Sequence, residues 1–159
     1  MKIYISGGTK KLRDLAQDFV EHCANIMLSE HTKQQLEIDL EFSKKLLKED
    51  GILAEMDFED KNHRPKEFSI TVDITGPLRR TLESIAHEMV HVKQYASGEM
   101  IEMEKTGRTK WKNRYISDRL NYWNRPWEIE AHGRELGLFI TWAEKNKLGS
   151  EAWTQEYHR

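Results

Sequence analysis

Residues 87–91 read His-Glu-Met-Val-His, and this H-E-x-x-H pentapeptide constrains the fold more than any other feature of the chain. On an α-helix, positions i and i+4 lie one above the other on the same face. A helix would therefore place the imidazoles of His87 and His91 next to each other, with Glu88 projecting beside them. Two neutral nitrogen ligands and a carboxylate that does not bind the ion are what a hydrolytic zinc site requires. We expect His87 and His91 to bind one Zn²⁺ ion and Glu88 to act as a general base.

The residues around the pentapeptide have the periodicity of an amphipathic helix. Apolar side chains recur at spacings of three and four residues and can bury against a sheet; they are Leu78, Leu82, Ile85, Met89 and Val92. Gly76-Pro77 precedes the segment, where proline is tolerated in a first turn, and Gly98 lies where the helix should end. His87 and His91 lie off the apolar stripe, on a face shared with Tyr95.

The rest of the chain predicts an α+β fold in one compact domain over residues 1–159. The expected order is an N-terminal helix, a small and mostly antiparallel sheet of three to four strands, the H-E-x-x-H helix, and a C-terminal helix. Apolar or alternating runs predict strands at 1–5, 36–42, 52–58 and 68–74, and a helix from Thr9 to about Ser29.

The segment between Gly98 and about Asn124 is irregular, and it fits either a hairpin or an excursion with a short helix at 115–122. Tyr122 and Trp123 are expected in the core rather than in a pocket wall, because aromatic side chains bury so much area. The last helix is expected to run from Pro126 to about Lys147. Its predicted buried residues are Ile129, Leu136, Phe139, Ile140 and Ala143.

A catalytic zinc needs three protein ligands and one open position, so a third ligand must come from outside the pentapeptide. The candidates are Glu128, Glu130, His132, Asp118 and His63. The last predicted helix presents Glu128 and His132 on one face, whereas Glu130 points about 160° away from Glu128. We expect Glu128, because small Ala131 three residues later allows the two helices to approach closely. Glu130 is the alternative third ligand.

Composition narrows the partners and the compartment. The net charge is −2 with 33% charged residues, so no basic excess favours nucleic acid as a partner. The lone Cys23 excludes an internal disulfide and a zinc ribbon, and it suits a reducing compartment. No apolar run approaches the roughly 20 residues that span a bilayer, and no secretory signal is evident. We therefore expect a cytoplasmic protein without a membrane partner; the sequence gives no indication of the oligomeric state.

The element order, the pentapeptide and the later segment Trp-Glu-Ile-Glu-Ala-His (residues 127–132) resemble the gluzincin branch of the zincin metallopeptidases. The likeness is to the small minigluzincins and phage-type metallopeptidase domains. In that group the third ligand is a glutamate of an E-x-x-A-type motif on a following helix, which residues 128–131 match. Several relatives have Asp or Asn four residues after that glutamate, whereas this chain has His132. No H-x-x-G-x-x-H extension includes His91, which argues against a metzincin.

The resemblance implies a zinc-dependent metallopeptidase that acts on a peptide or protein, and a phage-encoded relative would act in the host cytoplasm. An oxyanion needs a donor besides zinc, and the candidates are Tyr95, Tyr115, Tyr122, His63 and His132. His132 could instead hydrogen-bond a metal ligand. By resemblance, an edge strand binds the substrate backbone, either residues 68–74 or the run before them. The alternative is a catalytically weak zincin-fold module for binding or regulation, and the intact Glu88 favours the enzyme.

Overall fold

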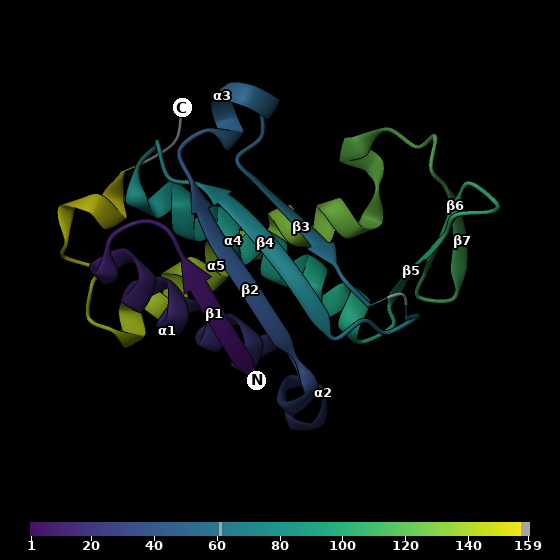
Figure 1. Cartoon of the computed structure of the whole chain (residues 1–159), viewed down its shortest axis with the longest axis horizontal. Helices are drawn as coiled ribbons and strands as arrows, with labels where there is room; N and C mark the ends of the chain where they lie inside the picture. Colours follow the sequence, from purple (N-terminus) through teal and green to yellow (C-terminus); the bar gives the residue numbers. More distant parts are fainter. Residues whose placement is uncertain (61, 157–159) are drawn as a thin grey trace.

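A four-stranded sheet carries the long helices of the molecule on one face (Figure 1). The structure is a computed structural model, and it describes residues 1–60 and 62–156. The strands are β1 (Lys2–Ser6), β2 (Glu37–Ser43), β3 (Ala54–Phe58) and β4 (Glu67–Asp73), in the order β1-β2-β4-β3. This arrangement agrees with the predicted α+β class.

The direction of the strands differs from the prediction of a mostly antiparallel sheet. In this four-stranded sheet, β1 pairs with β2 and β2 pairs with β4 in parallel, whereas β3 pairs with β4 antiparallel. Between β1 and β2 the chain passes through α1 (Lys10–Met27) and α2 (Glu30–Gln35). A helical crossover of this kind returns the chain to the end of the sheet at which it started, so the next strand runs parallel to the first.

Burial alternates along the inner strands as the sequence pattern predicted. On β2 the side chains of Ile38, Leu40 and Phe42 are buried, whereas Asp39 and Glu41 are exposed. The buried set faces the helical layer and the acidic set lies on the open face of the sheet. One face of the sheet therefore carries the core.

The helix with the pentapeptide, α4 (Leu78–Ala96), packs between the sheet, α1 and α5 (Pro126–Lys145). Its predicted apolar stripe is confirmed, because Leu82, Ile85, Met89 and Val92 are fully buried and Leu78 is half-buried. Gly98 follows the helix with a φ of 76°, a left-handed conformation that favours glycine. None of the described helices is long and apolar enough to cross a membrane.

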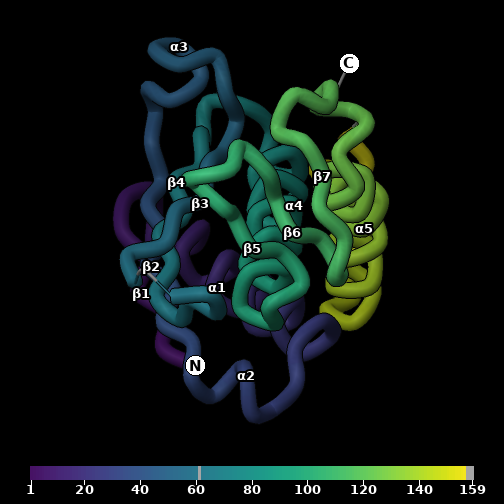
Figure 2. The backbone as a smooth tube through the Cα atoms, turned by 90° about the vertical axis from the view of Figure 1, so that its right-hand side faces the viewer, coloured from purple at the N-terminus to yellow at the C-terminus, as the bar shows by residue number. Residues whose placement is uncertain are grey.

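The segment after α4 forms a second sheet. Strands β5 (Met100–Met103), β6 (Arg108–Trp111) and β7 (Arg114–Ser117) pair antiparallel in that order. The hairpin interpretation is thus confirmed and the helix at 115–122 is wrong; a single 3₁₀ turn covers Tyr122–Asn124. The ring centroid of Trp111 lies 6.1 Å from that of Trp127 at the start of α5. This contact holds the meander β5–β7 near the N-terminal end of α5, on the side of the molecule that faces the viewer in Figure 2.

Two burial predictions near α5 are wrong. Phe139 and Ala143 are buried as expected, but Ile129, Leu136 and Ile140 are 58%, 46% and 41% exposed. The face that packs inward carries Trp127, Ala131, Leu138 and Trp142 instead. Tyr122 and Trp123 are also outside the core, at 39% and 67% exposed. The remaining elements are α3 (Leu46–Asp50) and a 3₁₀ turn at Ala152–Gln155.

Candidate metal centre

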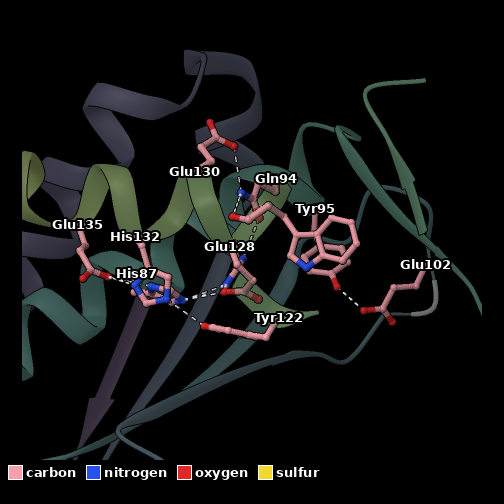
Figure 3. Close-up of polar contacts among 11 residues, drawn as sticks. His87, Gln94, Tyr95, Glu102, Tyr122, Glu128, Glu130, His132 and Glu135 are labelled. Carbon is pink, nitrogen blue, oxygen red and sulfur yellow. Dashed lines mark hydrogen bonds and ion pairs between the residues drawn. The ribbon is translucent and has the colours of Figure 1, made fainter. Parts of the chain in front are cut away.

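Three ligand-type side chains from α4 and α5 converge on one point (Figure 3). His87 Nε2 lies 3.2 Å from His91 Nε2. Glu128 Oε2 lies 3.3 Å from His87 Nε2 and 3.4 Å from His91 Nε2. The structure therefore brings together the three residues that the sequence predicted as zinc ligands.

The local sequence explains how the two helices meet there. His87 and His91 are one helical turn apart on α4, and Glu128 lies in the first turn of α5, which begins at Pro126. Ala131 is fully buried one turn later. Its methyl group leaves room for α4 to approach α5 closely, which was the reason to expect Glu128 at the site.

Each imidazole is oriented through its other ring nitrogen. His87 Nδ1 donates to Glu135 Oε2 over 2.8 Å, and His91 Nδ1 donates to Gln94 Oε1 over 2.8 Å. A proton on Nδ1 leaves the lone pair of each Nε2 directed at the convergence point. Partners of this kind fix the tautomer and ring orientation of metal-binding histidines.

Gln94 also joins the two helices. Its amide Nε2 donates to Trp127 O and to Glu130 Oε2, both over 3.0 Å, and the side chain is fully buried. Glu130 additionally accepts from Lys93 Nζ over 2.8 Å. Glu130, the alternative third ligand, thus contacts Lys93 and Gln94 of α4 instead of joining His87 and His91, and it braces the helix pair.

The spacing of the three atoms tests whether they fit a metal ion. Zinc ligands lie about 2.0–2.2 Å from a tetrahedral ion, so they lie about 3.4 Å from one another. The three measured separations are 3.2, 3.3 and 3.4 Å. Glu128 Oε2 is also a buried oxygen without a hydrogen-bond partner among the described residues, and such an orphan costs stability unless something binds it. The residues fit a zinc ion.

Electrostatics at the site favour a cation. Burial alone would lower the pKa of His87, but the carboxylates of Glu128 and Glu135 outweigh it and raise the pKa to about 9. His91 shifts in the same direction through Glu128 and Glu88, against its burial. Burial would raise the pKa of Glu128, but the two histidines outweigh it and hold that pKa far below its ordinary value. Without a metal, protons on the imidazoles would balance the buried carboxylate.

Glu88 lines the cavities beside the cluster and does not belong to the group of three ligand-type residues. It is 7% exposed, and burial raises its pKa above the ordinary range. No described residue hydrogen-bonds its carboxylate. Two adjoining cavities meet at His87 and Glu88, so this carboxylate borders the space in which a substrate would lie.

The other predicted residues divide into those near the centre and those away from it. The Tyr122 hydroxyl lies 3.1 Å from His132 Nε2, and both residues line the cavity beside His87. Tyr95 is buried, and its hydroxyl donates to Glu102 rather than facing the histidines (Figure 3). The remaining candidates lie elsewhere: His63 and Tyr115 are exposed, and Asp118 accepts from Thr109.

Sequence reasoning missed Glu135 and Gln94. Glu135 follows Glu128 by seven residues, two helical turns, and therefore lies on the same face of α5; Gln94 follows His91 by three residues on α4. The helical spacing was available as a signal for both. His87, His132 and Glu135 also form a second group whose ligand atoms lie within 4.8 Å of one another, and it uses Glu135, the orienting partner of His87 Nδ1.

No protein-family model, curated protein or solved structure matches this chain.

Proposed function

We propose that the chain is a zinc-dependent metallopeptidase of the gluzincin type, with His87, His91 and Glu128 as ligands. The observation that supports this most directly is the orphaned oxygen of Glu128 at 3.3 and 3.4 Å from two oriented imidazoles. Together with the 3.2 Å between the two Nε2 atoms, these separations match a tetrahedral zinc site. A carboxylate that borders the same space without binding the ion, Glu88, distinguishes a hydrolytic site from a structural one.

When bound, zinc would lower the pKa of a water ligand to about 7 and polarise the substrate carbonyl. Glu88 would accept the proton of the attacking water and deliver it to the leaving amine. Its burial and raised pKa suit this role, because a general base works best with a pKa near the working pH. Positioned proton transfer of this kind contributes about 10²–10⁴-fold to a rate.

Tyr122 and His132 are the donors best placed for the developing oxyanion. Tyr122 lines both cavities at the centre, and its hydroxyl is held by His132 Nε2 at 3.1 Å. A donor fixed in advance stabilises transition-state charge without reorganisation. The two tyrosines differ in their partners. Tyr95 donates its hydroxyl proton to the Glu102 carboxylate, whereas His132 with a proton on Nε2 donates to the Tyr122 oxygen and leaves the Tyr122 O–H available.

The substrate backbone would bind along β3. Residues 68–74, one of the two candidates from the sequence, coincide with β4, which lies between β2 and β3 and has no free edge. The run before them forms β3, the edge strand, and all five of its residues line the cavity that reaches Glu88. An extended peptide would add to this edge through main-chain hydrogen bonds.

Glu88→Gln tests the proposal. The variant keeps the size and polarity of the side chain and removes its basicity, so we expect zinc content equal to wild type and loss of about 10²–10⁴-fold in cleavage of an unfolded protein substrate. Glu144→Gln, an exposed position on the same protein, should change neither. If Glu88→Gln retains the full function of wild type, the chain is instead a zincin-fold binding or regulatory module.

The ligand assignment has its own test. Zinc content of purified Glu128→Ala should fall well below one ion per chain, whereas Glu130→Ala should keep the ion and lose only bracing between α4 and α5. Zinc loss in Glu130→Ala alone would show that Glu128 is not the third ligand.

A further inference from the structure

The cleft beside the metal centre has a marked charge. It runs between β3 and β5 and ends at Glu88. The residues that line it include four acids, Glu55, Asp57, Glu102 and Glu104. Arg125 is the one lysine or arginine among the described residues that line it, and two of its N–H groups donate to the main-chain oxygens of residues 118 and 120. A ligand in this cleft would meet a strongly negative field.

The two acidic residues on β3 have no cationic partner in the described part of the chain. Glu55 and Asp57 are exposed and form no ion pair there; Asp57 Oδ1 accepts only from the neighbouring Phe58 N–H over 2.8 Å. Glu88, more than nine-tenths buried and also without a hydrogen-bond partner in the described part of the chain, lines the same cleft. A buried, unpartnered carboxylate beside unpaired surface ones indicates that the cleft receives a ligand from outside.

The hydrogen-bond ladder fixes which groups of β3 that ligand would meet. Asp73 N donates to Leu53 O, and Glu59 N donates to Glu67 O. Hydrogen-bonded pairs alternate in an antiparallel ladder. The main-chain N–H and C=O groups of the odd-numbered residues of β3 are therefore directed at β4. The main-chain groups of Ala54 and Met56 therefore face the open edge.

We infer, on the basis of the proposed function, that the substrate is a basic peptide with lysine or arginine at two positions separated by one residue, opposite Glu55 and Asp57. These two side chains lie on the same face of β3 because strand residues two apart share a face. In an added strand, the residues opposite them are likewise two apart. Each opposite-charge pair across strands should strengthen binding by about 1.5- to 5-fold.

Binding can be measured apart from cleavage with the zinc-loaded full-length Glu88→Gln variant. Three labelled peptides would be compared by fluorescence anisotropy: one with Lys-Val-Lys at its centre, an isomer with Val-Lys-Lys, and a version of the first with Glu for Lys. We expect the Kd of the Lys-Val-Lys peptide to be about 2- to 5-fold lower than that of its isomer and at least tenfold lower than that of the glutamate peptide. The preference should shrink at high salt, because exposed pairs are screened.

Charge reversal locates the effect. Glu55→Lys combined with Asp57→Lys should invert the order of the lysine and glutamate peptides. Asp39→Lys is the matched control. Asp39 is an exposed acid on β2, on the same face of the sheet as Glu55 and Asp57, and β2 lies two strands or about 10 Å from β3. Equal Kd values for the lysine and glutamate peptides, no measurable binding of any peptide, or an equal effect of Asp39→Lys would overturn the inference.

Failure of the inference differs from failure of the proposed function. If wild-type protein with zinc cleaves all three peptides at equal kcat/KM and binds them equally, the peptidase stands and the basic preference is refuted. If it cleaves nothing while Glu88→Gln still discriminates between the peptides, the basic cleft stands and the peptidase does not.

Discussion

The two histidines of the metal centre are oriented by chemically different partners. A carboxylate, Glu135, accepts from His87 Nδ1, whereas a neutral amide, Gln94, accepts from His91 Nδ1. A carboxylate makes the imidazole a more basic ligand as well as orienting it. Glu135 is also partly exposed and lies at the cavity wall, so it can be replaced with little disturbance of the core.

Removal of the Glu135 carboxylate should weaken zinc binding without removing a ligand. We expect Glu135→Ala to raise the Kd for zinc by about 10- to 100-fold and Glu135→Gln to raise it less, because an amide oxygen still accepts from His87. Competition with a chromophoric chelator measures both. Glu144→Gln serves as the surface control, and equal zinc affinity of Glu135→Ala and wild type would contradict the role assigned to Glu135.

The buried carboxylate of Asp73, at the end of β4, should make the stability of the fold depend on pH. Burial alone would raise its pKa, but hydrogen bonds from the Thr75 hydroxyl and from the main-chain N–H groups of Thr75 and Leu47 outweigh this and lower the pKa. A lowered folded-state pKa contributes stability above the unfolded value of about 3.9, and this stability is lost as the pH falls below it.

Asp73→Asn should therefore destabilise the protein more at pH 7 than at pH 3. At neutral pH the expected loss in free energy of unfolding is about 1–3 kcal/mol, since buried donors lose a charged acceptor. Urea unfolding of wild type and variant at the two pH values measures the difference, with exposed Asp50→Asn as the control. A loss that is the same at both pH values would refute the assigned ionisation.

The local sequence pattern of α5 is sufficient to predict the helix but not the face of the helix that is buried. Pro126 and the downstream apolar residues predicted the helix itself, and the structure has it from Pro126 to Lys145. Apolar residues lie on two of its faces, however, and only the position of α4 decides which face is buried. For the same reason the sequence predicted the strands of the sheet but not their direction, because the path of α1 decides that.

Two leucines of α5 test this distinction with matched substitutions. Leu138 is 4% exposed and Leu136 is 46% exposed, and both change to alanine on the same helix. Leu138→Ala should cost about 2–5 kcal/mol of unfolding free energy through the cavity that it leaves. Leu136→Ala should stay within about 0.5 kcal/mol, as a surface change. Chemical unfolding of both variants measures the two losses in free energy of unfolding. Comparable losses would mean that the outer face of α5 is covered.

For the whole molecule, the candidate centre is predictable in part because it is built from short helical spacings. His87, Glu88 and His91 share one turn, and Glu128 lies next to the small residue Ala131. The cleft is different, since β3 and β5 are separated by more than 40 residues and only the assembled fold places them together. Glu135 and Gln94, which the sequence analysis did not single out, are intermediate in predictability. Each lies at a helical spacing from a ligand on its own helix, but its contacts with the other helix are known only from the packing of α4 against α5.

The candidate metal centre joins α4 to α5, so zinc bound there should stabilise the entire fold. An ion that binds the folded chain alone, supplied at about 100 times its Kd, adds about 2.7 kcal/mol, which corresponds to roughly 5–10 °C in Tm for a chain of this size. Scanning calorimetry with zinc and with a chelator should show this shift in wild type and in Glu88→Gln, because Glu88 is not one of the three proposed ligands.

Glu128→Ala should lose most of the zinc-dependent shift in Tm, since only two ligands remain. The chelated forms of wild type and variant serve as the baseline, because the substitution also removes the carboxylate that the protonated imidazoles balance in the absence of metal. A zinc-dependent shift of equal size in Glu128→Ala would place the ion elsewhere in the molecule.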